Sequence, residues 1–385
     1  MTDFDSFFGD LYDDSHRQFR AACRRFTETE IAPHAYAWEE AEIFPRELYK
    51  KAADIGIIGA AFPEAYGGSG GDQRMALVVS EELIRGGSTG VLVGLGSHGI
   101  GLPPILYLGS EEQKQRWVPP VLAGEKIAAL AVTEPGTGSD VAGIRTTATR
   151  DGDGYRLRGA KLFITSGTRA DTLSVLARTS DDPHGGLTFF VVERGMEGFS
   201  VSRSLKKMGW RASDTAELVF DDVFVPMSHR LGDEGSGFVA VMQNFQNERL
   251  SLAGIAVASA QRALELSMQY VQDRSAFGRK LSHFQVTKHK LAQMSTQLYG
   301  AKALTYRVAA AMSRGEYVVK EVSMAKNLAT DMAEYVCNEA VQIHGGMGYM
   351  RETEVERLYR DVRLLPIGGG TREIMNEIIS KLLMS

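Results

Sequence analysis

Hydrophobic positions change their spacing twice along the chain. The first part has apolar residues at helical intervals, as in Phe19, Cys23 and Phe26. A Gly-rich loop at 63–71 interrupts this pattern, and a second Gly-rich stretch precedes residue 110. We expect helices within three segments, with loops between them: 11–57, 72–86 and 110–123.

Beyond Lys126 the apolar runs become short or alternate with polar residues, which is typical of strands. Turn sequences such as Asp151-Gly152-Asp153-Gly154 separate some of them. They predict an antiparallel, barrel-like β domain of about 100 residues. The expected strands are 127–132, 155–164, 172–179, 187–192 and 216–225.

From Gly235 the pattern is helical again, with long, Ala-rich amphipathic segments that indicate a four-helix bundle. These segments are 236–273, 284–313, 317–344 and 371–384. The fold class is therefore expected to be α+β and mostly α. We expect an N-terminal helical domain at 1–125, a middle β domain at 126–234 and a C-terminal helical domain at 235–385.

Composition narrows the class of protein. The chain has 385 residues, 44% hydrophobic and 24% charged, with a net charge of −5 and no basic cluster that would indicate nucleic-acid binding. Two cysteines, Cys23 and Cys337, argue against a disulfide framework and favour a reducing compartment. No HExxH or CxxC spacing predicts a metal.

The acidic start of the chain lacks the features of a secretory or transit peptide. Apolar stretches such as 52–62 and 119–132 are shorter than the roughly 18–20 residues that span a bilayer. From these features we expect a soluble cytoplasmic protein without a membrane span.

One glycine motif suggests a dinucleotide site but lacks its context. Gly94-Leu95-Gly96-Ser97-His98-Gly99 matches GxGxxG and follows the apolar run 91–93. Pro103 and Pro104 would interrupt the required helix, and no βαβ pattern surrounds the motif. We interpret this segment as a packed or flexible loop.

Two motifs in the β region carry a family resemblance. The segment 131–140, which reads AVTEPGTGSD, resembles the flavin-binding signature of the acyl-CoA dehydrogenases, and 161–167, KLFITSG, resembles their second motif. A turn of small residues lets backbone amides approach a cofactor closely. Taken alone, either segment could be an ordinary strand with its loop. Glu134 lies in the first motif, and we interpret it as structural.

Two further motifs lie in the helical C-terminal region. Arg274-Ser275-Ala276-Phe277-Gly278 with His283-Phe284-Gln285 resembles the family motif by which a neighbouring subunit holds FAD, and 342–349, QIHGGMGY, resembles the loop that admits its adenine end. Taken alone, Arg274 would be a solvated charge and the glycines a helix stop. All four motifs occur in family order, and the resemblance covers residues 12–384.

The resemblance implies FAD bound between subunits of a homotetramer built as a dimer of dimers, with electron-transferring flavoprotein as a partner. It implies that Phe163 packs on the isoalloxazine ring and that Thr165 bonds near its reactive nitrogen. The residues implied to bind the cofactor are Leu130, Val132, Thr133, Gly138, Ser139, Phe163, Thr165, Arg274, Ala276, Phe277, Gln285, Gln342, His344, Gly345, Gly346, Thr371 and Glu373.

The catalytic base of the family is missing from its common position. Many members carry a Glu in their last motif, which here reads Gly368-Gly369-Gly370-Thr371. In the isovaleryl-CoA and long-chain branches the base lies instead at the position of Glu248, next to a family Arg that corresponds to Arg249. Taken alone, Glu248 would be an exposed carboxylate in a first helical turn. The resemblance implies that Glu248 is the base and that the Gly369 amide binds the thioester carbonyl.

The implied reaction is α,β-dehydrogenation of an acyl-CoA, in which a base takes the α proton and the β hydrogen leaves as hydride to the flavin. The implied substrate-binding residues are Ser139, Phe245, Arg249, Gly368 and Gly369. The missing side chains at 368 and 369 favour a medium or long straight acyl chain, with short branched or terpenoid chains as the alternative. An acyl-CoA oxidase, a flavin monooxygenase and a non-catalytic scaffold subunit are competing functions.

Overall fold

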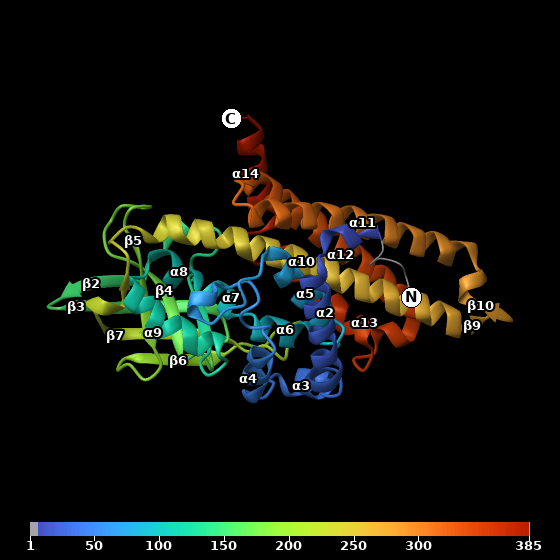
Figure 1. Ribbon diagram of the computed structural model, residues 1–385, viewed down its shortest axis with the longest axis horizontal. Coiled ribbons are helices and arrows are strands. Elements are labelled where there is room, and N and C mark those ends of the chain that lie inside the picture. Colours follow the sequence, from blue (N-terminus) through green and yellow to red (C-terminus); the bar gives the residue numbers. More distant parts are fainter. Residues whose placement is uncertain (1–6, 385) are drawn as a thin grey trace.

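Long C-terminal helices run from a β-sheet at one end of the molecule to a small hairpin at the other (Figure 1). The computed structural model describes residues 7–384. Residues 1–6 of the acidic N-terminal segment and Ser385 lie outside this range, as do the outer limits of the expected domains. The N-terminal helices lie against the middle of the long helices, where α5 packs on α10.

Side-chain caps fix several of the N-terminal helices. Asp13 accepts a hydrogen bond from His16 N, Asp72 accepts from Arg74 N and Met75 N, and Ser110 forms a capping box with Gln113. A π-helical turn, Thr27–Ile31, extends the first helix towards Pro33. The helices are α2 (Asp14–Phe26), α3 (Ala35–Ala41), α4 (Glu47–Asp54), α5 (Gln73–Ile84), α6 (Thr89–Leu95), α7 (His98–Gly101), α8 (Pro103–Leu108) and α9 (Glu111–Leu122).

The stretch between α5 and α9 is helical, which corrects the expectation of a Gly-rich loop. Ser88 caps α6 by accepting from Val91 N. Pro103 and Pro104 occupy the first positions of α8, where a helix needs no backbone N–H donor. The GxGxxG residues are thus the end of α6, a turn and the start of α7.

The same stretch is longer than the apolar segments expected from the sequence. By length and composition Thr89–Leu108 could cross a membrane, so the expectation that every apolar stretch is too short for this is wrong. It consists of three short helices, and 61% of it is buried inside the protein. A buried core segment of a globular protein passes the same test, so this is weak evidence for a membrane span.

The middle of the chain forms a mixed sheet with the order β6-β7-β3-β2-β4-β5-β8. Most pairs are antiparallel, as expected, but β1 and β2 each pair with β4 in parallel. Strands β2, β6 and β8 were not predicted, because they are short or mostly exposed. The strands are β1 (Ala128–Ala131), β2 (Thr147–Asp151), β3 (Gly154–Thr165), β4 (Thr172–Arg178), β5 (Leu187–Glu193), β6 (Phe199–Ser204), β7 (Thr215–Pro226) and β8 (Arg230–Leu231).

The C-terminal helices match the predicted segments to within about two residues, which is the normal uncertainty of helix ends. One further helix, α13, was not predicted. The elements are α10 (Gly237–Asp273), β9 (Ser275–Ala276), β10 (Arg279–Lys280), α11 (Gln285–Ser313), α12 (Val319–His344), α13 (Glu354–Val362) and α14 (Arg372–Met384). Short 3₁₀ turns occur at Gly9–Leu11, Glu64–Tyr66, Val141–Gly143, Met227–His229, Leu281–His283 and Gly345–Tyr349.

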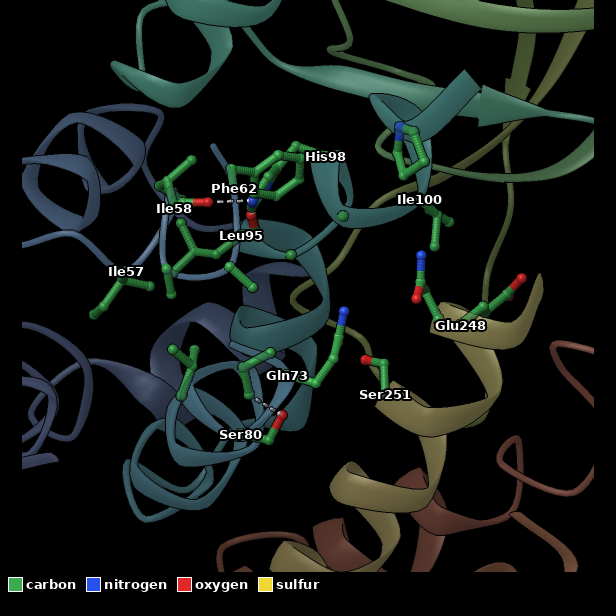
Figure 2. A pocket seen from close by; sticks show the side chains of 18 of the residues that line it. Ile57, Ile58, Phe62, Gln73, Ser80, Leu95, His98, Ile100, Glu248 and Ser251 are labelled. Carbon is green, nitrogen blue, oxygen red and sulfur yellow. Dashed lines mark hydrogen bonds between the residues drawn. The ribbon is translucent and has the colours of Figure 1, made fainter. Parts of the chain in front are cut away.

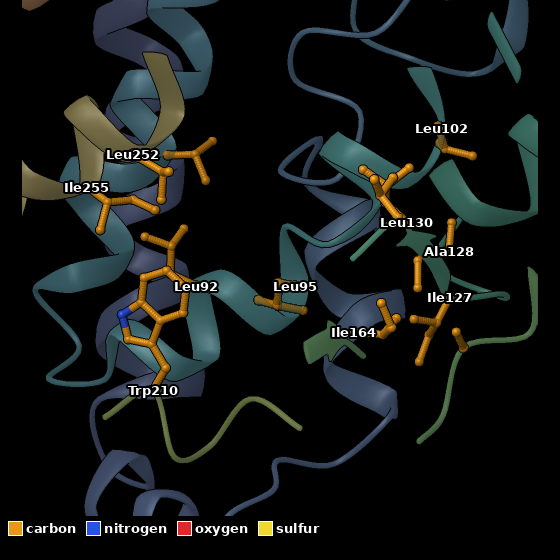
Figure 3. Packing of buried hydrophobic residues seen from close by; sticks show 14 of the residues in the cluster. Leu92, Leu95, Leu102, Ile127, Ala128, Leu130, Ile164, Trp210, Leu252 and Ile255 are labelled. Atoms are coloured by element: carbon orange, nitrogen blue, oxygen red, sulfur yellow. The ribbon is translucent and has the colours of Figure 1, made fainter. Parts of the chain in front are cut away.

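One hydrophobic core joins the three parts of the chain. Leu92 lies beside Trp210 and near Leu252 and Ile255 of α10, whereas the β1 residues Ala128 and Leu130 pack on the other side of the α6–α8 stretch (Figure 3). Hydrogen bonds reinforce this bridge, because Ser97 donates to Ala128 O and Asn244 donates to Ile100 O. The α6–α8 stretch therefore fixes β1 and α10 relative to each other.

Candidate active site

A largely apolar cavity of about 490 Å³ opens between the N-terminal helices and α10. Its walls come from segment 57–66 and helices α5 to α8, and its α10 wall is Asn247, Glu248 and Ser251. Gln73 of α5 and Ser251 face the same space (Figure 2). His98 holds two walls together, since its ring nitrogens lie 2.8 Å from Leu95 O and 2.6 Å from Ile58 O.

Glu248 is the acidic side chain of this cavity. It lies about three turns inside α10, which begins at Gly237, so the interpretation of this segment as a helix start is wrong. Burial raises the pKa of Glu248, while Lys326 and Arg249 act in the opposite direction. A carboxyl group in this environment can take up a proton near neutral pH more readily than a solvated Glu.

Gly369 lies directly beside Glu248. A Cβ atom placed on Gly369 would lie 3.3 Å from Glu248 Cγ and only 2.6 Å from Leu252 Cδ1. Gly369 also has a φ of +62°, in the left-handed region that disfavours residues with a side chain. The turn therefore requires glycine at 369 for both conformation and space.

Two cations hold the carbonyl groups of this turn. Arg249 Nε donates to Gly369 O at 3.4 Å, and Lys326 Nζ donates to Gly370 O at 2.5 Å. Within the part of the chain that the structure describes, the Gly369 N–H has no hydrogen-bond acceptor. A backbone donor is thus left available next to the carboxylate of Glu248.

The two predicted flavin motifs lie side by side. Leu162 N donates to Thr133 O, and Lys161 Nζ donates to Val132 O, both at 2.8 Å. Glu134 accepts from Arg145 N, Thr146 N and Lys161 Nζ, so this carboxylate is committed to holding the turn, as its structural interpretation requires.

The surface beside this turn fits a flat cofactor. Gly136 and Gly138 face open space, since a Cβ atom on either would meet nothing within 4 Å. Phe163 lies at an irregularity in the β3–β7 pairing, has a φ of +62° and is 64% exposed. The exposed aromatic ring offers a stacking surface and the accessible backbone offers hydrogen-bonding groups, and an isoalloxazine ring can use both.

The other predicted FAD residues lie at the far end of the molecule. Arg274, Ala276 and Phe277 belong to the β9–β10 hairpin, at the opposite end from the β-sheet (Figure 1). His344 is near them, because its ring stacks on Tyr270 of α10 at 4.2 Å. Gln342, Gly345 and Gly346 adjoin His344, and Gln285 begins α11 just after the hairpin.

The remaining predicted residues lie on α10, near the start of α14 or in the predicted flavin turn. Phe245 precedes Glu248 on α10, and Gly368 precedes the Gly369–Gly370 turn. Thr371 accepts a hydrogen bond from Ile374 N and so stabilises the start of α14, whose first turn contains Glu373. Ser139 belongs to the flavin turn beside Gly138.

Lys326 is the residue of this cluster that the sequence reasoning missed. It is fully buried on α12, on the face that carries Val322 and Ala329. A lysine at that spacing on an apolar face is a recognisable signal, because a buried charge needs a nearby acceptor or counter-charge.

Comparisons with known proteins agree with this arrangement. Three family models match: the acyl-CoA dehydrogenase N-terminal domain at residues 13–125, the middle domain at 129–223 and the C-terminal domain at 235–384. The long-chain specific acyl-CoA dehydrogenase of Sus scrofa mitochondria is 40% identical over 96% of this chain and 87% of its own length. The chain belongs to the acyl-CoA dehydrogenase family.

Solved structures show the same fold. A probable acyl-CoA dehydrogenase from Mycobacterium abscessus has a TM-score of 0.95 and 50% identity, covering 97% of this chain and 100% of its own. A glutaryl-CoA dehydrogenase from Mycobacterium smegmatis, solved in complex with FADH2, has a TM-score of 0.92 and 30% identity, covering 97% of this chain and 96% of its own. The protein is accordingly an FAD-dependent acyl-CoA dehydrogenase, as the sequence predicts.

Proposed function

We propose that this enzyme converts a medium- or long-chain acyl-CoA to the trans-2-enoyl-CoA, with Glu248 taking the α proton. Bound FAD would supply the acceptor for the β hydrogen, which leaves as hydride. The observation that carries the proposal is the closeness of Glu248 and Gly369: Glu248 lines the apolar cavity and has a raised pKa, and a Cβ atom on Gly369 would lie 3.3 Å from its Cγ atom.

The Gly369 amide has a defined role in this proposal. Negative charge develops on the thioester oxygen as the α proton leaves, and a fixed donor stabilises it in a site from which water is excluded. Arg249 and Lys326 hold the carbonyls of the same turn, which keeps the amide in one orientation. Glu248 then needs to accept only the proton.

The separation of the predicted FAD residues supports binding between two copies of the chain. Phe163 and Arg274 lie on elements at opposite ends of one molecule, so one extended cofactor would contact them from different subunits. We therefore propose the homotetramer that the resemblance implies, with Arg274, Phe277 and Gln285 reaching the FAD of a neighbour. Electron-transferring flavoprotein is the proposed acceptor of the electrons, and the proposed process is fatty acid β-oxidation.

Two observations support a medium or long acyl chain. The cavity is lined mainly by apolar residues of segment 57–66 and α5 to α8, and its volume lies within the normal range for small-molecule sites. Gly96 and Gly99 in its wall carry no side chain that would shorten it. The long-chain specific relative from Sus scrofa is also 40% identical over nearly all of this chain.

The test is anaerobic reduction of the bound flavin by acyl-CoA thioesters of increasing length and branching. We expect the flavin absorbance to bleach, with the highest kcat/KM for straight chains of medium or long length. A preference for short branched or terpenoid thioesters would correct the substrate, and hydrogen peroxide formed at the rate of turnover in air would identify an oxidase. Bound FAD that no acyl-CoA reduces would refute the proposed activity.

A further inference from the structure

We propose that Lys326 is a positioning residue for this dehydrogenation: its ammonium group fixes the Gly369–Gly370 turn through the Gly370 carbonyl and supplies the positive charge that faces Glu248. This inference rests on the proposed function and deepens it. Lys326 is not expected to touch the substrate, and its effect passes through the base and the backbone donor.

The first observation is the way in which Lys326 differs from the other fully buried lysines of the described chain. Lys161 lies 2.8 Å from Glu134, and Lys302 lies 2.9 Å from Glu81. Lys326 is equally buried, yet among residues 7–384 no carboxylate lies within 4.0 Å of its Nζ atom. Burial of a charge without a paired counter-ion is costly, so a purely structural lysine would be expected to have such a partner.

The second observation is the position of its one hydrogen-bond acceptor. Lys326 Nζ donates to Gly370 O at 2.5 Å, and its neighbour Asn327 donates to Arg372 O at 3.2 Å. Two successive residues of α12 therefore hold the turn just after Gly369. From the other side, Arg249 of α10 holds Gly369 O. The free Gly369 amide is thus fixed between α10 and α12.

The third observation is the set of charges around Lys326. Glu248 raises the pKa of Lys326, whereas burial, the largest effect, together with Arg249 and Arg372 lowers it to about 8. Arg372 is itself paired with Asp331 and Glu334 of α12. In return, Lys326 opposes the rise in the Glu248 pKa more strongly than Arg249 does. Lys326 and Glu248 therefore each stabilise the charged form of the other.

Lys326 would assist the reaction both before and during proton transfer. A base in an apolar cavity risks being protonated before substrate binds, and a nearby cation keeps it a carboxylate. When Glu248 takes the α proton, its own charge is neutralised and negative charge appears on the thioester oxygen. A cation behind the Gly369–Gly370 turn then faces that developing charge, which lowers the energy of the transition state.

The experiment compares Lys326→Met and Lys326→Arg with the wild type by single-turnover flavin bleaching, from about pH 6 to 9. Lys326→Met removes the charge at similar volume, so we expect the acidic limb of the rate profile to move up by about one pH unit and the plateau rate to fall about 10-fold or more. Lys326→Arg keeps a permanent charge, so its acidic limb should stay at the wild-type pH. Its rate should also persist above about pH 8, where the wild-type rate declines as Lys326 loses its proton.

Lys302→Met is the matched control, because Lys302 is also fully buried but pairs with Glu81 away from the cavity. It should lower the melting temperature without moving the acidic limb. FAD content and melting temperature are measured for every variant. If Lys326→Met does not fold, the bleaching rate of Lys326→Arg above about pH 8 still tests the inference by itself.

Two failures are distinguishable. If wild-type enzyme bleaches with acyl-CoA but neither Lys326 variant changes the pH profile, Lys326 has only a structural role and the inference is wrong, while the proposed function stands. If the wild type with full FAD content bleaches with no acyl-CoA, the proposed function is wrong and the inference falls with it.

Discussion

Glu248 occupies the space that a side chain at position 369 would need. A Cβ atom on Gly369 would lie 3.3 Å from Glu248 Cγ and 3.4 Å from Glu248 Cδ. Two segments that are distant in the chain thereby place the Glu248 carboxylate beside the Gly369–Gly370 turn. A carboxylate supplied from either segment would reach the same small volume, so either position could supply the proposed base.

Replacing the base should abolish chemistry while sparing binding. We expect Glu248→Gln to keep its FAD and to bind acyl-CoA, but to bleach about 10²- to 10⁴-fold more slowly, because the amide cannot accept the α proton. Stopped-flow absorbance under anaerobic conditions measures this rate. The exposed Glu377→Gln is the control and should behave as wild type. Near-normal bleaching by Glu248→Gln would falsify the assignment of the base.

The turn itself should tolerate alanine at only one of two adjacent glycines. Gly369→Ala forces a side chain into left-handed backbone and against Leu252 Cδ1 at 2.6 Å, so we expect a loss of about 1–2 kcal/mol of stability and a lower bleaching rate. At Gly368 the nearest atom to an added Cβ is Leu364 O at 3.8 Å, so Gly368→Ala should change stability by less than about 0.5 kcal/mol. Denaturant unfolding compares the two, and equal losses would contradict this explanation.

Gly369→Glu should lower activity as well. It adds a second carboxylate next to Glu248, and two adjacent carboxylates cannot both stay ionised in an apolar cavity. We expect slower bleaching and a shift of the acidic limb to higher pH. Unchanged turnover and an unchanged acidic limb would show that a side chain at position 369 does not reach the surroundings of Glu248.

The preference of the enzyme for acyl chains of a given length should depend on the cavity wall at Gly99. Gly99 lines the cavity, and a Cβ atom placed there would meet no atom within 4 Å. We expect Gly99→Leu to fold normally and to lower kcat/KM for long acyl chains about 10-fold more than for short ones, because leucine fills part of the space. The short-chain substrates serve as the internal control. An equal effect on all lengths would mean that the acyl chain does not pass Gly99.

Replacing Phe163 should weaken FAD binding without destabilising the folded protein. Because Phe163 has a φ of +62°, Phe163→Gly relieves backbone strain while removing the ring that would pack on the cofactor. We expect lower FAD occupancy after desalting, measured by absorbance, with no fall in the melting temperature of the cofactor-free protein. Tyr317→Ser, at an 80% exposed aromatic, should retain FAD. Full occupancy in Phe163→Gly would remove this residue from the site.

The contribution of Asp361 to stability should fall as the pH rises through neutrality. Burial and the Glu39 carboxylate raise the pKa of Asp361 to about 7, whereas an unfolded Asp titrates near about 4. Between these values the folded state binds the proton more tightly, so its stabilising effect is present at low pH and lost as the pH rises through about 7. Thermal unfolding of wild type and Asp361→Asn at about pH 6 and 8 isolates this contribution: over this pH rise, the melting temperature of the wild type should move downward by about 2 °C or more relative to that of the variant. Glu377→Gln should leave the pH dependence unchanged.

The amino-acid pattern by itself determined the class of the fold and most of its elements. Long helices such as α10, α11 and α12 repeat apolar residues over many turns, so their limits could be predicted to within about two residues. Short elements escaped prediction. Strands β2, β6 and β8 bury too few residues to show a period, and α6 to α8 are apolar on most sides, which hides the helical spacing.

The sequence also pointed to Glu248 and to the vacant side chain at Gly369, but only through a family resemblance. Whether these two residues meet, and what else meets them, depends on how α10, α12 and the turn before α14 pack together. Tertiary structure alone decided that Lys326 holds the Gly370 carbonyl, because contacts between distant segments leave no periodic signal in the chain. It likewise decided that the β-sheet, which carries Phe163, and the β9–β10 hairpin lie at opposite ends of one molecule, since separation in space follows from the direction of long helices and not from residue type.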